Sequence, residues 1–305
     1  MALDNVSQLP TLDSKSEAAP GRPERVEVLT RVCVDELLEA FGLGGVGRGR
    51  RPLELLSRVP AKRLARQVAT YDEIVGESGL AAGGTWALGR MARRVEVEGR
   101  ENVPADGPLL LVANHPGLAD ALALFATVPR EDLRVVAAER PFLAALPNTS
   151  RYLIPVSEAS HPKRFGAVRI ATRHLKGGGA ILTFPGGRIE PDPAVLPGAL
   201  QALERWSESL DLFARLVPDL TVVPAVVSGV LSPTALRNPL IFVRRRPRDR
   251  EWLAASIQMM TPALRNVTTQ IAFGGPVHNG NVPERTVREA VLEEARRLIE
   301  RYEAR

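Results

Sequence analysis

The feature that most constrains the fold is an alternation, from Val95 onward, between short apolar runs and longer segments with helical periodicity. An apolar run of four to eight residues has the length of a buried strand, and helices between such runs indicate helices layered on a sheet. The sequence therefore predicts an α/β fold. The expected strands are 95–99, 108–114, 133–138, 152–156, 180–184, 220–227 and 239–244.

Helices are predicted where apolar residues recur every three or four positions. One such series runs from Leu200 to Phe213 and another from Val287 to Tyr302. Ahead of the alternation, the pattern is helical from Val26 to about Phe41 and again from about Pro60 to Arg94, where several glycines interrupt it.

The chain is expected to have three parts. Residues 1–25 mix Ser, Pro, Asp, Glu and Ala without periodicity, which is typical of a mobile tail. A helical segment over 26–94 would follow it, and an α/β domain with a C-terminal helix would occupy 95–305.

The charge and the cysteine content of the sequence limit the classes of binding partner and the cellular compartment to expect. The formal net charge is +5 and the sequence pI is about 9.8, which favours an anionic membrane surface, a nucleic acid or an acidic carrier protein. Cys33 is the only cysteine, so no intrachain disulfide can form and a reducing compartment is expected. The sequence shows neither a signal peptide nor an apolar run of 18 residues. We expect a cytoplasmic protein that rests on the inner face of the cell membrane.

Two segments are candidates for contact with membrane lipid. Residues 79–94 combine small and apolar residues with a basic end, so this stretch either lies in a membrane interface or packs against the main domain. The basic cluster over 244–250 is either a solvated loop or a site for phosphates of lipid, coenzyme A or a carrier protein. It lacks interleaved aromatic residues and a recognisable nucleic-acid module, so no nucleic-acid partner is expected.

The most informative segment runs from Pro108 to Ala126. Its apolar run reaches Asn114, and His115 then precedes Pro116, a residue suited to the first turn of a helix. The carboxyl ends of strands are where open α/β sheets bind ligands. With His115 outside the first helical turn, Asp120 can approach it despite the five-residue spacing.

That pairing has a specific chemical use. A hydroxyl is a weak nucleophile until a base accepts its proton, and a neutral imidazole does this near pH 7 when a carboxylate fixes its tautomer. This turn contains no serine or cysteine that could become acylated. Direct attack by a bound acceptor alcohol is therefore favoured over an acyl-enzyme route.

The same segment resembles the first block, NHxxxxD, of the glycerolphosphate and lysophospholipid acyltransferases. Three more stretches resemble the later blocks in order: YLIPV (152–156), TFPGGR (183–188, where the third block is usually FPEGTR) and VVPAVV (222–227). The resemblance covers about residues 90 to 230. It implies a mixed sheet flanked by helices, with His115 and Asp120 as the catalytic dyad.

The third block also has a physical interpretation. Exposed backbone N–H groups in a glycine-rich turn, together with a guanidinium, can hold a phosphate or another anionic headgroup. Two departures from the family pattern bear on the acceptor. In the third block, Gly186 stands where glutamate is usual and the arginine comes one residue early. The second block continues with Ser157 and Glu158, where the family often has an arginine for the acceptor phosphate. The expected substrate-binding residues are Asn114, Phe184, Pro185, Gly186, Gly187 and Arg188.

The resemblance implies transfer of a fatty acyl group from a coenzyme A or acyl carrier protein thioester to a hydroxyl of a glycerophospholipid-like acceptor. No cofactor is expected, and no metal, because the histidines lack a second ligand at metal spacing. Three alternatives stay open: a lipid-binding protein that keeps the fold without turnover, an acyltransferase for an acceptor that lacks phosphate, and a nucleic-acid-binding protein, which rests on charge alone.

Overall fold

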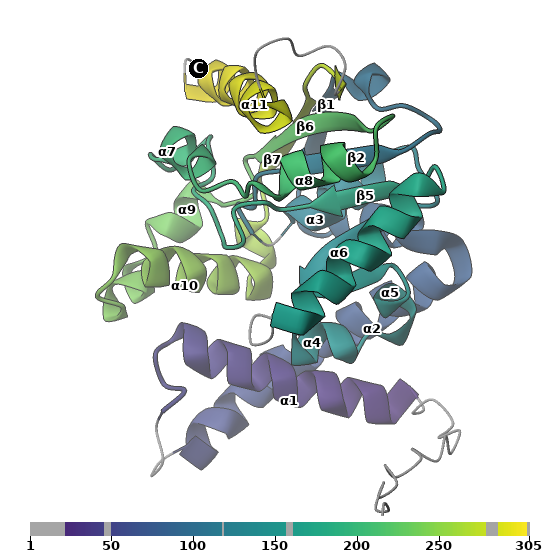
Figure 1. The fold of residues 1–305 in the computed structure, drawn as a ribbon. Helices are drawn as coiled ribbons and strands as arrows, with labels where there is room; N and C mark the ends of the chain where they lie inside the picture. The colour runs from purple at the N-terminus through teal and green to yellow at the C-terminus, as the bar shows by residue number, and fades with distance from the viewer. Residues whose placement is uncertain (1–21, 46–49, 118, 157–160, 279–285, 304–305) are drawn as a thin grey trace, which may run out of the picture.

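A computed structural model describes residues 22–45, 50–117, 119–156, 161–278 and 286–303. It consists of an eight-stranded mixed sheet with helices on both faces, preceded by two long helices (Figure 1). This is the α/β architecture predicted from the alternating pattern. Of the tail expected over residues 1–25, positions 22–25 belong to the first helix, and the rest lies outside the described residues.

Seven of the strands follow a single path across the sheet, in the order β1-β7-β6-β2-β5-β3-β4, and β8 pairs with β6. The strands are β1 (Arg94–Glu98), β2 (Leu109–Ala113), β3 (Arg134–Ala138), β4 (Leu153–Val156), β5 (Ala180–Thr183), β6 (Thr221–Ser228), β7 (Thr268–Phe273) and β8 (Val277–His278).

Six of the seven expected strands are confirmed to within one or two residues, and the seventh is wrong. The segment expected as a strand over 239–244 is a 3-10 helix, η2 (Pro239–Val243). Pro239 begins it, and the Asn238 side chain accepts a hydrogen bond from Leu240 N, which fixes a turn in place of an extended chain. Strand β7 was missed because its first residues are polar and only its last three form an apolar run.

The helices are α1 (Arg22–Ala40), α2 (Arg50–Leu88), α3 (Asp120–Thr127), α4 (Pro141–Ala144), α5 (Pro147–Ser150), α6 (His161–Lys176), α7 (Ala199–Leu203), α8 (Ser209–Leu216), α9 (Pro233–Leu236), α10 (Pro247–Met260) and α11 (Val287–Glu303), with 3-10 turns η1 (Arg100–Asn102) and η3 (Pro262–Leu264). The single helix expected between Leu200 and Phe213 is therefore two helices. Trp206 lies between them and is only 1% exposed.

Strand β2 is the centre of the fold and is buried on both faces. Leu109 and Leu111 belong to the apolar cluster that includes α2 and α3 side chains, whereas Leu110 and Val112 belong to the cluster that includes α6, α8 and α11. This alternation follows from the two-residue repeat of a strand. In Figure 1, α6 and α8 lie in front of the sheet and α3 lies behind it.

The stretch over 79–94 packs against the main domain, which was one of its two interpretations. Gly84 approaches α3 so closely that an added Cβ would lie 2.8 Å from Phe125 Cβ and 2.9 Å from Leu122 O. Leu80, Ala87 and Leu88 are also buried. Within the described part of the chain, no helix is long and apolar enough to cross a membrane.

The strand directions create one edge where loops converge. Strands β6, β2, β5, β3 and β4 run parallel to one another, so their carboxyl ends meet at the same edge of the sheet. Because β2 lies between β5 and β6, the loops that follow these three strands are neighbours there.

Candidate active site

His115 and Asp120 lie in the loop after β2 and at the start of α3. His115 Nδ1 and Asp120 Oδ2 are 2.6 Å apart, so the expected approach of the two side chains is confirmed. Helix α3 begins at Asp120, later than expected, and Pro116 lies in the loop instead of in the first helical turn. Gly117 has a φ of 91°, a left-handed conformation that suits glycine and folds the loop back toward Asp120.

Three further features hold the Asp120 carboxylate in place. Gly117 N donates to Oδ2 at 3.0 Å, Ala121 N donates to Oδ1 at 2.7 Å, and the Asp120 side chain is only 1% exposed. Two backbone donors fix the orientation of the carboxylate. It can therefore hold the His115 ring in one tautomer, with the proton on Nδ1.

The His115 ring is 31% exposed and stacks on Phe184, with the ring centroids 4.5 Å apart and an interplanar angle of 29°. Phe184 directly follows β5, the strand next to β2, so the first and third sequence blocks meet here. Since Nδ1 is bonded to Asp120, Nε2 is the nitrogen that can accept a proton from a substrate.

Opposing effects set the pKa of His115. Burial lowers it, but the Asp120 charge, the Asp120 hydrogen bond and the charge of Glu190 outweigh burial, so the pKa lies above its usual value. A raised pKa gives a stronger base, which is neutral only at correspondingly higher pH.

The third block forms a tight turn beside this dyad. Gly187 N donates to Phe184 O at 3.1 Å, and Gly187 has a φ of 65°. Pro185 is buried, Gly186 is half-buried, and Gly187 and Arg188 are exposed. Ile189, the next residue, lies over Gly117 in the first loop.

Asn114, expected to bind substrate, uses its side chain inside the protein. Its Nδ2 donates to Val227 O at 2.9 Å, and Val227 N donates to its Oδ1 at 2.7 Å. The side chain is buried and joins the end of β2 to β6. Its placement supports a role in positioning His115 and gives no support to contact with substrate.

Sequence reasoning missed two acidic residues that follow the third block. Glu190 is buried beneath the dyad loop, and its backbone N donates to His115 O at 2.8 Å. Asp192 is buried and accepts hydrogen bonds from Gly229 N, Val230 N and Leu231 N, which ties this loop to the end of β6. The one feature of the sequence that could have pointed to these residues was the absence of glutamate at position 186.

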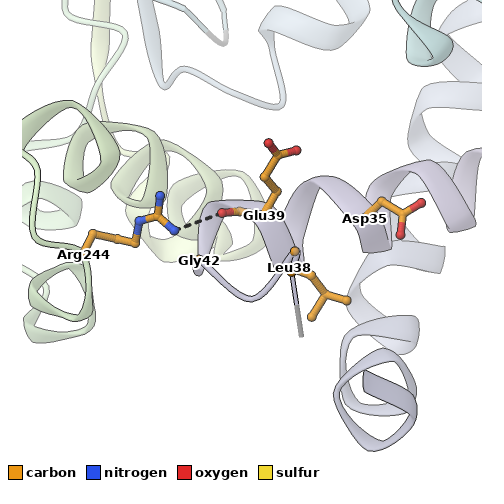
Figure 2. A pocket seen from close by; sticks show the side chains of 7 residues that line it. Asp35, Leu38, Glu39, Gly42 and Arg244 are labelled. Carbon is orange, nitrogen blue, oxygen red and sulfur yellow. Dashed lines mark hydrogen bonds between the residues drawn. The ribbon is translucent and has the colours of Figure 1, made fainter. Parts of the chain in front are cut away.

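Within the described residues, no group of three His, Cys, Asp or Glu side chains is arranged to hold a metal ion. Figure 2 shows a hollow at the end of α1, lined by Asp35, Leu38, Glu39, Gly42 and Arg244 among others. Arg244 donates to the Glu39 carbonyl there at 3.2 Å. None of the residues that line this hollow belongs to the dyad or to the third block.

Residues 94–228 match the model of the acyltransferase family. The chain carries an acyltransferase domain. This match confirms the resemblance first seen in the four sequence blocks, and acyl transfer is the chemistry of the domain. The matched residues run from β1 to the end of β6 and include the dyad and the third block.

No curated protein matches the chain. Among solved structures, the chain aligns with the crystal structure of the 1-acyl-sn-glycerophosphate (LPA) acyltransferase, PlsC, from Thermotoga maritima. The two chains are 20% identical, the alignment covers 93% of this chain and 97% of that chain, and the TM-score is 0.47.

Proposed function

We propose that this acyltransferase moves a fatty acyl group from a coenzyme A or acyl carrier protein thioester to a hydroxyl of a lysophospholipid-like acceptor. The observation that carries the proposal is the 2.6 Å contact between His115 and Asp120 at the carboxyl edge of the sheet. Residues 95–305 would form the catalytic domain and residues 26–94 a helical segment attached to it.

In the proposed reaction, His115 carries the proton from the acceptor hydroxyl to the leaving thiol. His115 Nε2 takes the proton of the acceptor hydroxyl as its oxygen attacks the thioester carbonyl carbon. Asp120 stabilises the imidazolium that forms, and backbone N–H groups of the first or third loop stabilise the oxyanion. When the tetrahedral intermediate collapses, the carbon–sulfur bond breaks and the thiol leaves with the proton from His115. The products are an ester and a free thiol, and the reaction requires neither a cofactor nor a metal.

Thiol release tests this proposal directly. Purified protein would be given an acyl-coenzyme A or an acyl carrier protein thioester together with a panel of lysophospholipids and uncharged long-chain alcohols. We expect thiol release that depends on a phosphate-bearing acceptor, with the ester identified by mass spectrometry. Binding of lipid without thiol release would favour a lipid-binding protein. Release with uncharged alcohols alone would favour an acceptor that lacks phosphate, and salt-dependent retention on DNA without release would favour nucleic-acid binding.

Arg188 is our candidate for the group that holds the anionic part of the acceptor. Its guanidinium is exposed in the third-block turn, and a guanidinium can bind a phosphate through two parallel hydrogen bonds. We expect Arg188→Ala to raise the KM for the acceptor by roughly ten- to a hundredfold, the loss of about 1.5 to 3 kcal/mol from one charge-assisted contact.

The KM for the thioester should change much less. Arg215→Ala, which removes an exposed guanidinium from α8, is the matched control and should leave both constants unchanged. If Arg188→Ala leaves the acceptor KM at the wild-type value, this turn does not bind the acceptor phosphate.

A membrane surface is the partner that we propose for the region η2–α10, because residues 79–94 are largely packed against the domain. Leu240, Phe242 and Val243 are 52%, 62% and 60% exposed, and exposed arginines follow them at positions 245, 246 and 248. Exposed apolar side chains beside arginines are the composition that binds anionic lipid. Such a contact would place the protein on the inner face of the cell membrane.

Vesicle flotation tests this surface. Each arginine near an anionic bilayer contributes about 1 kcal/mol, so replacing Arg245, Arg246 and Arg248 by Gln should weaken binding to anionic vesicles by roughly a hundredfold. The same change at Arg296, Arg297 and Arg301 of α11 is the control, since α11 lies at the top of the molecule, well above α10 (Figure 1). A different result would be that the first variant binds anionic vesicles as well as the wild type does, while changing the exposed Leu55 and Leu56 of α2 abolishes binding. That result would assign the membrane contact to α2.

A further inference from the structure

The carboxyl group of Glu190 occupies space that the third block leaves empty. A Cβ built on Gly186 would overlap Glu190 Oε1, so a side chain at position 186 and the carboxyl of Glu190 exclude each other. The blocks that this segment resembles usually have glutamate at that position. Here the carboxyl group comes from a residue four positions later in the chain.

Glu190 is fixed by contacts from two segments, the loop between α7 and α8 and the loop after β2. Trp206 Nε1, between α7 and α8, donates to its Oε1 at 3.0 Å, and Trp206 is itself almost fully buried. His115 N faces its Oε2 at 3.4 Å, and Glu190 N donates to His115 O at 2.8 Å. The backbone of His115 is thus held on both its N–H and its C=O sides by one residue.

This arrangement separates two tasks within the site. Asp120 orients the His115 ring through Nδ1, whereas the hydrogen bonds between Glu190 and His115 involve only the His115 backbone. We infer that Glu190 is a positioning residue for acyl transfer, which holds the His115 backbone in the geometry needed for proton transfer and places a second negative charge beside the imidazole. This inference rests on the proposed role of His115 as the base.

Electrostatics supports the same assignment. Burial raises the pKa of Glu190 to about 7, although the hydrogen bonds from Trp206 and His115 and the charges of His115 and Arg205 lower it in part. The charge of Glu190 in turn contributes to the raised pKa of His115. The group therefore titrates in the range where the base must lose its own proton.

Glu190→Ala removes the side-chain contacts to His115 N and Trp206 Nε1 and leaves the backbone hydrogen bond from Glu190 N to His115 O. Glu190→Gln keeps the shape of the side chain while removing its charge. We expect Glu190→Ala to lower kcat about ten- to a hundredfold, since a small displacement of a catalytic base has effects of that size, with little change in the thioester KM. Glu190→Gln should retain more of kcat. It should also move the acid limb of the pH–rate profile to lower pH, because His115 loses a neighbouring negative charge. Glu208→Ala, at an exposed carboxylate before α8, is the control.

Two further measurements test the role of Glu190 without requiring enzyme activity. NMR titration of the imidazole, assigned by comparison with His115→Ala, should show a lower His115 pKa in Glu190→Gln. Gly186→Ala should lower the melting temperature of the wild type by several degrees and have little effect in the Glu190→Ala background, where the overlap is removed. If wild-type protein released no thiol, the proposed function would fail while these two measurements still tested Glu190.

The inference is overturned if both Glu190 variants keep the wild-type kcat, acid limb and His115 titration. A change confined to the melting temperature would overturn it as well, because Glu190 would then serve only to stabilise the fold. Equal effects of Gly186→Ala in both backgrounds would show that the Glu190 carboxyl does not occupy the space beside Gly186.

Discussion

His115→Ala is expected to lower acyl transfer by roughly 10³- to 10⁴-fold, because it removes the only group proposed to accept the acceptor's proton. The fold should persist, since the side chain is partly exposed and lies in a loop. Thiol release under saturating substrates gives kcat, and circular dichroism and thermal unfolding report whether the variant is folded. His278→Ala removes an imidazole from β8, outside the dyad and the third block, and should be nearly silent.

The same residue sets the expected pH dependence. Only neutral His115 can act as the base, and its pKa is raised above the usual 6.5. The profile of kcat/KM should therefore fall on the acid side, with an apparent pKa above 6.5. A folded His115→Ala protein with near-normal turnover, or an acid limb that this substitution leaves unchanged, would rule out His115 as the base.

Asp120→Asn should have the second largest effect, a loss of about 10²- to 10⁴-fold in kcat with little change in KM. The amide can keep one acceptor for Ala121 N or for Gly117 N, but it cannot supply a charge to the imidazolium that develops during attack. Losing that charge should also lower the pKa of His115, so the acid limb should move to lower pH while the rate at every pH stays low.

Asp219→Asn, a neutralisation of an exposed carboxylate before β6, is the matched control. Because the Asp120 side chain is only 1% exposed, the variant's melting temperature must be measured alongside its rate. Folded Asp120→Asn protein that turns over within about twofold of wild type would show that the dyad contact is not used in catalysis.

Local sequence patterns were sufficient to predict most of the helices and strands and one part of the candidate site. Strand β2 was predicted because its apolar run is bounded at Asn114, and burial on both faces requires such a run. The approach of Asp120 to His115 was predicted because both residues lie in one short loop, where chain geometry leaves few arrangements. The strand predicted over 239–244 was wrong because an apolar run does not by itself indicate whether a neighbouring strand is available for pairing.

The tertiary structure decided what surrounds the dyad. Asn114 and Val227 are 113 positions apart, and His115 and Glu190 are 75 apart, so these contacts exist only because β5 and β6 flank β2. Strand order depends on how the whole set of apolar faces is buried together, and no local periodicity records it. The sequence alone thus identified the acyltransferase blocks and the pair His115 and Asp120. The fold decided that Asn114 faces inward and that Glu190 fills the space at Gly186, since burial and excluded volume act between segments distant in the chain.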